Sequence, residues 1–353
     1  MKKNILLTFV ASVILINLGA QSSIEKNGQS LNVITTAVPL LMIGPDARAG
    51  GMGDGGVASS PDANSMHWNP AKYSRIADDM GFSFSYTPWL RNLVNDINLA
   101  YVSFYKRINP VSTFASSLRY FSLGEITFTD NTGMPIGTYK PNEFAIDATY
   151  SRILSDKFSL AVAGRFIYSD LTQGQFVQGV ETKPGISVAA DIAMYWEDDV
   201  DWFKSMDATF AWGVNISNIG NKISYSGTNI EKDFIPTNLR IGPRLTLELD
   251  DYNSISFQVD INKLLVPTPP IYADSTNPDG SYIILKGMDP NVSPIQGMIQ
   301  SWYDAPGGFS EEMREFSFAF GTEYWYTDVL ALRGGFFYED LTKGNRKYAT
   351  LGI

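Results

Sequence analysis

Apolar and polar residues alternate with a period of two along most of the chain after Gly81. Between Phe158 and Tyr168 the even-numbered positions are apolar or Gly, whereas the odd-numbered positions are mostly small or charged. Because successive side chains of a strand point to opposite faces, this alternation predicts strands with one apolar face. The pattern recurs in about twelve segments of about ten residues, the length of a tilted strand that crosses a bilayer. A soluble β-sandwich alternates in the same way, so the alternation alone leaves both classes open.

The connections between these segments decide between the two classes. Short connections cover residues 107–112, 154–157, 250–253 and 326–328, with 197–206 slightly longer, and they alternate with long ones over residues 128–143, 171–183, 218–238 and 262–315. Short turns at one end and long loops at the other are typical of outer-membrane barrels. Aromatic residues that suit a membrane interface lie beside the short turns: Trp196, Trp202, Tyr252, Tyr324, Trp325 and Tyr326. We therefore predict an all-β fold, a transmembrane antiparallel β-barrel over residues 81–353.

Residues 1–20 have the features of a signal peptide. Lys2 and Lys3 precede an apolar run over residues 5–18, and small residues follow up to Ala20, which makes Gln21 the expected new N-terminus. The run is shorter than the ~20 residues that a membrane-spanning helix needs. We expect an exported protein of a Gram-negative cell whose membrane residence comes from strands.

Composition excludes several classes of protein. The chain has no Cys, which excludes a disulfide scaffold and a Cys-based metal or redox site. Aromatic residues make up 13% of the chain and charged residues only 18%. The mean hydropathy is nevertheless −0.08, as expected when apolar and polar positions are interleaved. The net charge of −10 argues against nucleic acid as a partner.

The stretch over residues 44–73 is rich in Gly and small polar residues and has no periodicity. Such a segment buries too little apolar surface to order itself, so it needs partners elsewhere in the chain. We predict that residues 21–80 form an N-terminal periplasmic segment and a plug in the barrel lumen. In this plug we expect Arg48 and Asp54 to bind lumen charges, and Trp68 to pack near the periplasmic mouth.

Several carboxylates fall on the small, polar face of the strands. A general acid/base pair among them is one interpretation. Arginines occupy the same face, so the simpler interpretation is a paired charge network that fills the barrel and holds the plug. The carboxylates are Asp147, Asp191, Asp260 and Glu323, and the arginines are Arg165, Arg240, Arg244 and Arg333.

Other chemical motifs lack the context that they need. Residues 51–56 match the spacing G-x-G-x-x-G, but neither a buried strand before them nor a helix after them is predicted. Residues 275–286 faintly resemble a calcium loop, yet Lys286 stands where a bidentate Glu is required. His67 is the only histidine, and no G-x-S-x-G nucleophile elbow accompanies it. We expect no enzyme activity, no metal site and no cofactor.

The segments PDARAGGMGD, SPDAN and HWNPAKY, the last of which contains Asn69, Pro70 and Ala71, resemble the N-terminal region of one family. This is the PorV (LptO) family of the Bacteroidetes type IX secretion system, which is FadL-like. The similarity extends over the signal peptide, the strand series and the loop with residues 267–270. It implies a fourteen-stranded barrel in the outer membrane, with Asn69 and Pro70 in the plug. Residues 348–353 resemble the start of a strand, and an open barrel edge in lipid is costly, so we expect this chain to lack its last strand or strands.

What this resemblance implies is a function in protein transport. Members of the family lie in the outer membrane among lipid and lipopolysaccharide. At the giant translocon barrel (SprA- or Sov-like) they bind secreted proteins that carry a C-terminal signal domain. They then deliver these proteins to a surface attachment complex with a PorU-like sortase.

A FadL-like channel for hydrophobic small molecules is the alternative. Such a channel needs an apolar path through the lumen, whereas the inward positions of these strands are mostly small, polar or charged. Exposed apolar loop residues instead usually mark protein contacts. The candidate partner-binding residues are Trp89 and Leu90 in the first long loop, and Met298, Ile299, Trp302 and Tyr303 in the longest.

Overall fold

The computed structural model describes residues 31–89, 96–129, 132–177, 180–204, 206–226, 232–277 and 282–353. The predicted signal peptide and Leu90 lie outside these ranges. Within them no helix is both long enough and apolar enough to cross a membrane.

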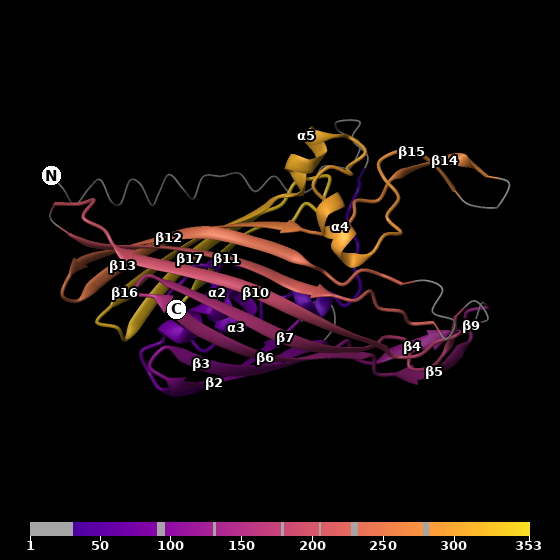
Figure 1. Cartoon of the computed structure of the whole chain (residues 1–353). Coiled ribbons are helices and arrows are strands. Elements are labelled where there is room, and N and C mark those ends of the chain that lie inside the picture. The colour runs from indigo at the N-terminus through magenta and orange to yellow at the C-terminus, as the bar shows by residue number, and fades with distance from the viewer. Residues whose placement is uncertain are drawn as a thin grey trace.

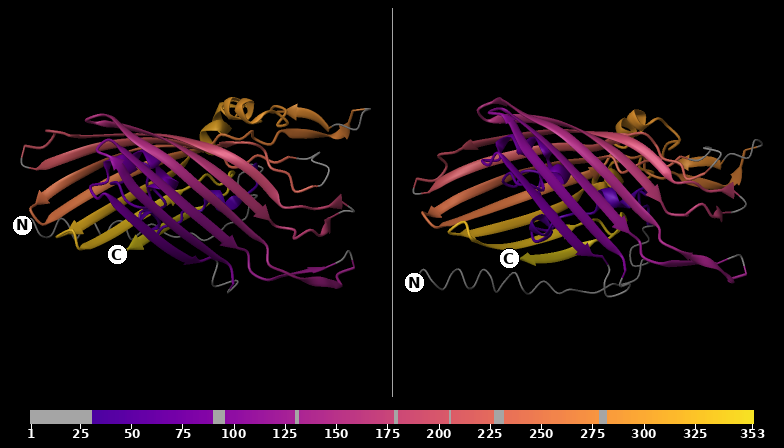
Figure 2. Two further views of the ribbon diagram at one scale, coloured as in Figure 1. Left: turned by 60° about the horizontal axis from the view of Figure 1, so that its bottom comes forward. Right: turned by 90° about the horizontal axis from the view of Figure 1, so that it is seen from below.

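One large antiparallel sheet of twelve strands dominates the structure, and each of its strands pairs with the next one along the chain. The strands are β1 (Met80–Pro88), β2 (Asn98–Asn109), β3 (Ser112–Ser122), β6 (Asn142–Ser155), β7 (Phe158–Asp170), β10 (Gly185–Asp199), β11 (Asp207–Gly220), β12 (Asn238–Asp250), β13 (Asn253–Leu264), β16 (Ser317–Tyr326), β17 (Leu330–Tyr338) and β18 (Lys347–Gly352). The sheet curls around the short helices of the N-terminal segment (Figures 1 and 2). In the described residues β1 and β18 are its two edges. The all-β barrel architecture is as predicted.

The two faces of the sheet differ as the alternation predicts. In β7 the exposed side chains include Val162 and Phe166, whereas Ala161, Ala163 and Arg165 are buried. The apolar face therefore points outward, and the small or charged face lines the lumen. An apolar outer face suits hydrocarbon chains, since lipid offers no partner to a polar side chain.

The two ends of the barrel differ in the length of their connections (Figure 1). The short turns gather at one end. The long loops at the other end form three hairpins: β4 (Ile126–Thr129) with β5 (Pro135–Tyr139), β8 (Phe176–Val177) with β9 (Val180–Glu181), and β14 (Ile271–Thr276) with β15 (Tyr282–Lys286). The longest loop also contains α4 (Pro294–Gln300), α5 (Phe309–Glu312) and η3 (Met313–Glu315).

The N-terminal segment runs through the lumen from the long-loop end to the short-turn end. It contains η1 (Pro39–Met42), α2 (Ala47–Gly50), α3 (Ser65–Trp68) and η2 (Pro70–Arg75). Near the long loops Val38 and Leu40 are fully buried in an apolar cluster with Leu99 and Ile167 from the wall. At the opposite end Arg75 donates to the carbonyl oxygen of Asp156, in the turn between β6 and β7.

This path corrects part of the expected domain organisation. The main-chain N–H of Asn32 donates to the carbonyl oxygen of Thr342, and that of Ala37 donates to the carbonyl oxygen of Phe234. Phe234 belongs to the long loop between β11 and β12, and Thr342 lies in the connection between β17 and β18 at the same end of the barrel. The part of the segment before η1 therefore lies at the long-loop mouth, and the expectation that it is periplasmic is wrong for these residues.

The plug approaches the wall most closely where glycine removes a side chain. A Cβ atom added at Gly335 in β17 would overlap main-chain atoms of Met52 and Gly53. Gly53 itself has a φ of 72°, a conformation that favours glycine. The neighbouring Gly334 is different, because the nearest atom to an added Cβ would be a side-chain methyl of Thr322 at 3.6 Å.

We predict that Gly335→Ala destabilises the folded protein by about 1–3 kcal/mol, because the plug backbone must move away from the wall. Gly334→Ala is the matched control and should leave stability nearly unchanged. Thermal unfolding in detergent micelles measures both. Equal unfolding temperatures for the two variants would contradict the close contact between plug and wall.

Candidate functional site

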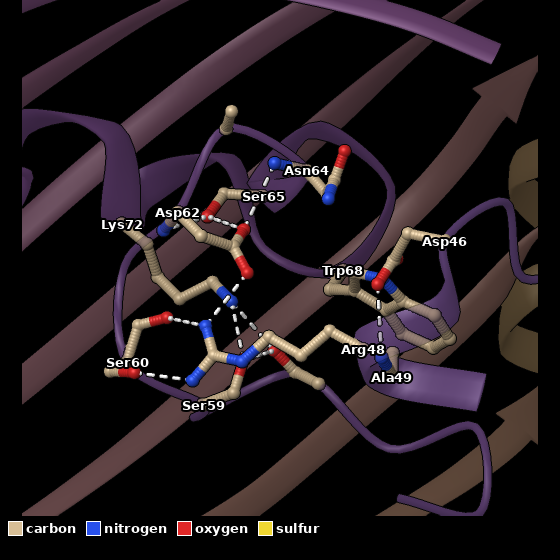
Figure 3. A network of polar contacts seen from close by, with 12 residues as sticks. Asp46, Arg48, Ala49, Ser59, Ser60, Asp62, Asn64, Ser65, Trp68 and Lys72 are labelled. Atoms are coloured by element: carbon tan, nitrogen blue, oxygen red, sulfur yellow. Dashed lines mark hydrogen bonds and ion pairs between the residues drawn. The ribbon is translucent and has the colours of Figure 1, made fainter. Parts of the chain in front are cut away.

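Arg48 links the plug to the barrel wall. Its guanidinium lies 2.8 Å from a carboxylate oxygen of Asp62 in the plug and 2.7 Å from one of Glu323 in β16. Arg333 in β17 donates to the other oxygen of Glu323 at 2.7 Å. Arg48 also donates to the main-chain oxygen of Ser60 (Figure 3). Burial alone would raise the pKa of Asp62, but Arg48 and then Lys72 outweigh it and hold this pKa below its ordinary value. The expected ion pair between Arg48 and a lumen charge is therefore present.

The plug backbone is held by polar side chains of the wall. The N–H groups of Gly56 and Val57 both donate to one carboxylate oxygen of Asp260 in β13, at 2.7 and 2.9 Å. Gln258, two residues before it on the same face, donates to the carbonyl oxygen of Gly55 at 2.8 Å. Since this segment has no regular secondary structure, the wall provides the hydrogen bonds that a helix or sheet would otherwise make.

Asp54 has a different kind of partner from the one expected. Its carboxylate accepts a hydrogen bond from the Tyr348 hydroxyl in β18, whereas a cation was expected. Burial raises the pKa of Asp54, and this phenol offsets part of that shift. The adjacent N–H of Gly53 donates to the Thr350 hydroxyl at 2.9 Å. β18 thus contacts the plug directly.

Trp68, Asn69 and Pro70 form the centre of the plug. The Trp68 indole N–H donates to Asp46 at 2.6 Å (Figure 3), and the Arg240 guanidinium lies over the indole ring, 4.6 Å from its centroid. The Asn69 side chain donates to the carbonyl oxygens of Val57 and of Met194 in β10, each at 2.9 Å. Pro70 begins η2, where its missing N–H costs nothing.

The prediction that Trp68 packs near the periplasmic mouth of the barrel is wrong. Its carbonyl oxygen accepts from Asn215 in β11, and its ring contacts Arg240 near the long-loop end of β12. Trp68 also lines a cavity of about 310 Å³ in this half of the lumen. It is therefore far from the short-turn mouth, because the chain enters the lumen from the other end.

Sequence reasoning missed several residues that hold the plug. Lys72 is fully buried and donates to the carbonyl oxygen of Gly56 and the hydroxyl of Ser59, both at 2.8 Å (Figure 3). Burial lowers the pKa of Lys72 to about 8. The hydroxyls of Ser151 and Ser159 both donate to the carbonyl oxygen of Ala71. The Ser residues were recognisable only as small inward positions, and nothing in the sequence marks Lys72 as buried.

The charged residues of the wall form the network that the sequence suggests. Arg165 in β7 pairs with Asp147 in β6 and, at 3.0 Å, with Asp191 in β10. Arg119 lies 3.5 Å from Asp147 and 2.8 Å from Nδ1 of His67. These carboxylates and guanidinium groups neutralise one another across neighbouring strands. Within the described ranges no group of three or more His, Asp or Glu side chains is placed to hold a metal ion.

A second buried ion-pair cluster fixes the longest loop. Lys263 at the end of β13 pairs with Glu312 at 3.2 Å and Glu315 at 2.6 Å. Lys343 pairs with Glu311 at 2.7 Å and Glu315 at 3.0 Å. The Asn32 side chain donates to Glu311 at 2.9 Å, so the N-terminal segment joins the cluster. The glutamate partners of both lysines are buried.

The loop candidates divide into two groups. Ile299, Trp302 and Tyr303 are 60%, 47% and 60% exposed, and Met298 is half-buried beside them. Trp89, by contrast, packs against the apolar cluster at the long-loop end of the lumen, which makes it part of the core rather than a free contact residue. The exposed candidates thus lie on the longest loop.

Comparison with known proteins identifies the family. The sequence model described as "Type IX secretion system protein PorV" matches residues 25–271, which is more than half of the chain. The chain belongs to the PorV family. It is thus an outer-membrane β-barrel protein and a component of the type IX secretion system. No curated protein matches the sequence.

Two solved structures are similar to the PorV-family chain. A FadL homologue of Pseudomonas aeruginosa has a TM-score of 0.38 and 11% identity, with 90% of this chain and 83% of that chain covered. The CymD monoaromatic hydrocarbon channel has a TM-score of 0.37 and 12% identity, with 88% and 85% covered.

The plug assignment predicts a change in conductance. Deleting residues 45–62 removes Arg48, Asp54 and the segment that Asp260 holds, so the deletion variant should conduct ions in planar bilayers far better than the intact protein. Deleting residues 127–138 shortens the hairpin of β4 and β5 outside the lumen and should leave conductance unchanged. If both deletions conduct no better than the parent, the plug assignment fails.

Asp304 lies in the longest loop, and its carboxyl group should make the stability of this loop depend on pH. Burial is the main cause that raises the pKa of Asp304 to about 6; hydrogen bonds from Thr268 oppose it, and the charges of Glu312 and Glu315 add to it. Between about pH 4 and pH 6 the folded loop then binds more protons than the unfolded loop, so its stability falls as the pH rises through this window.

Asp304→Asn keeps an acceptor for the Thr268 N–H and removes the charge. The variant should match the parent near pH 4 and exceed it near pH 7 by up to roughly 2–3 kcal/mol. Urea titrations at the two pH values, followed by protease resistance of the loop, provide the comparison. An advantage that is the same at both pH values would show that the charge of Asp304 is not the cause.

Proposed function

We propose that this PorV-family protein binds secreted proteins that carry a C-terminal signal domain at the translocon and delivers them to the surface attachment complex, without any catalytic step of its own. The observation that carries the proposal is the apolar surface of the longest loop, around α4. Ile295 on α4, together with Ile299, Trp302 and Tyr303, is exposed at the end of the barrel with the long loops. Exposed apolar groups that gather on one loop are typical of protein contacts.

The loop is held in one conformation before any partner binds. Ser293 caps α4 by accepting from the N–H of Gln296, and Gln300 at the other end of α4 donates to the carbonyl oxygen of Asp289. The buried ion pairs of Lys263 and Lys343 fix the end of the loop next to β16. A preorganised loop loses less conformational entropy on binding than a mobile one, so more of its contact energy becomes affinity.

The lumen is less suited to a channel for hydrophobic compounds. The cavity beside Trp68 has apolar walls at Leu41, Leu264 and Phe337, but its lining also includes charged and amide side chains: Asp54, Arg165, Asn218, Asn238, Arg240, Asn262, Glu339 and Arg346. An apolar ligand would displace water from these polar groups, which costs free energy wherever the protein does not replace the lost hydrogen bonds. Transport of a hydrophobic small molecule is therefore the competing hypothesis that the following test must separate.

We predict that replacing Trp302 and Tyr303 with Ala reduces the recovery of co-purifying secreted proteins and translocon roughly tenfold or more, since buried aromatic anchors contribute about 2 kcal/mol each. Affinity purification from outer membranes, followed by identification of the bound proteins, measures this loss. Assembly of the barrel should not change, and heat-modifiable migration on gels checks it.

Tyr86→Ala with Tyr120→Ala is the matched control, because these aromatic residues are similarly exposed, at 57% and 41%, on the lipid-facing strands β1 and β3. Their replacement should leave the recovered proteins unchanged. A loop variant that keeps all its protein partners but loses uptake of a hydrophobic compound would support the channel instead.

A further inference from the structure

The cavity of about 310 Å³ in the lumen is lined on one side by a continuous patch of the barrel wall. In the register of the sheet Arg240 stands opposite Asn262, and Asn238, one row nearer the long-loop mouth, stands opposite Leu264. Side chains opposite each other on neighbouring strands are about 5 Å apart, so those of the patch converge on the cavity. The patch consists of Ser217, Asn238, Arg240, Asn262, Leu264 and Ser317, from β11, β12, β13 and β16.

Arg240 is the cation of this patch, and its charge is only partly balanced. Its Nε atom lies 3.9 Å from a carboxylate oxygen of Asp260, which already accepts from two main-chain N–H groups of the plug. Nε donates to the side-chain oxygen of Asn262 at 2.7 Å, and Nη1 donates to the carbonyl oxygen of His67 at 3.4 Å. Nη2 has no acceptor among the described residues, and the side chain is 13% exposed where it lines the cavity. Nη2 is therefore available to a ligand.

The acidic side chains of the lining already have donors. Asp54 accepts from the Tyr348 hydroxyl, Glu339 accepts from Arg346 at 2.7 Å, and Glu315 accepts from two buried lysines at 2.6 and 3.0 Å. The other cations of the lining have carboxylate partners within 3.0 Å: Arg165, Lys343 and Arg346. Among the described residues of the lining, Arg240 is thus the cation with which an added anion would pair.

The cavity also has an apolar side and an opening. Leu41 of the plug faces it together with Leu264 and Phe337 of the wall. Val33 and Gly344, which line it as well, are exposed at the long-loop mouth. A cavity of about 150 Å³ holds benzene, so this one has room for about a dozen non-hydrogen atoms.

We infer that this cavity binds a carboxylate with an adjacent apolar group. The carboxylate accepts from Nη2 of Arg240 and from the side-chain amide of Asn238, and the apolar group packs against Leu264 and Phe337. Hydrogen bonds between ionised partners are about twice as strong as those between neutral groups, so the polar lining that disfavours a hydrocarbon suits this anion.

A free small molecule and the C-terminal residue of a polypeptide chain that enters through the mouth present the same chemistry to the cavity. The site is separate from the loop surface around α4 and does not rest on the function proposed for that surface.

Titration calorimetry of the purified full chain in a neutral detergent tests the inference with two pairs of probes. The first pair is phenylbutanoate and the neutral phenylbutanamide, and the second is a short peptide that ends in Phe, with a free or an amidated C-terminus. In at least one pair the carboxylate should bind, and its neutral counterpart should bind at least tenfold more weakly. Binding of phenylbutanoate indicates a free small molecule as the ligand, whereas binding of the free peptide alone indicates a polypeptide C-terminus.

Asn238→Ala tests the site without disturbing the fold, because the Asn238 side chain has no hydrogen bond to the described residues. It should weaken carboxylate binding roughly threefold to tenfold and leave the unfolding temperature unchanged. Arg240→Gln should remove the preference for the charged probe, and Arg240→Lys should restore part of it. Thr246→Ala is the matched control, since Thr246 lies on the same strand and face but lines the cavity at the short-turn end.

Three results would each overturn the inference. Neutral probes that bind as tightly as the carboxylates would show an apolar pocket without an anion site. Unchanged affinity in both Asn238→Ala and Arg240→Gln, with heat-modifiable migration intact, would place the carboxylate elsewhere. Absence of binding by both carboxylate probes would leave the cavity without this function.

Discussion

The structure depends on one requirement, that the backbone of a glycine-rich segment inside a barrel finds hydrogen-bond partners. In a helix or strand these partners belong to the chain's own regular structure, but most of residues 44–64 have none. The wall therefore provides them through Asp260 and Gln258, and Arg48 ties the segment to Glu323. The polar lumen follows from this requirement, since inward side chains such as Asp147 pair within the wall and others such as Asp260 hold the plug.

The strands were predictable because their signal is local. An apolar outer face and a small, polar inner face impose a two-residue period that needs no knowledge of the rest of the fold, as in β7. The lumen charges followed from the same period. The position of Trp68 and the burial of Trp89 were not predictable, because both depend on the end from which residues 31–43 enter the lumen. That direction is set by contacts between residues far apart in sequence, such as Asn32 with Glu311.

The surface loops were also only partly predictable from the sequence. Exposed Trp302 and Tyr303 were recognisable as unusual apolar residues within a long connection. The lysines that fix this loop were not, because Lys263 lies at the end of a strand and Lys343 in a different loop, and each looks like a solvated charge in the sequence. Membership of the PorV family places this exposed apolar surface around α4 on an outer-membrane protein of the type IX secretion system.

The contacts between the plug and the last strands have a consequence for how the protein folds. Asp54 and Tyr348 are separated by 294 positions, and Gly56 and Asp260 by 204. Contacts between residues so far apart in sequence close large loops, so they form late and slow the folding of a chain. The plug leaves the ribosome before the strands that hold it are synthesised. The wall must therefore assemble around a segment that stays extended and soluble until then, and its glycines and small polar residues, which resist premature collapse, suit that interval.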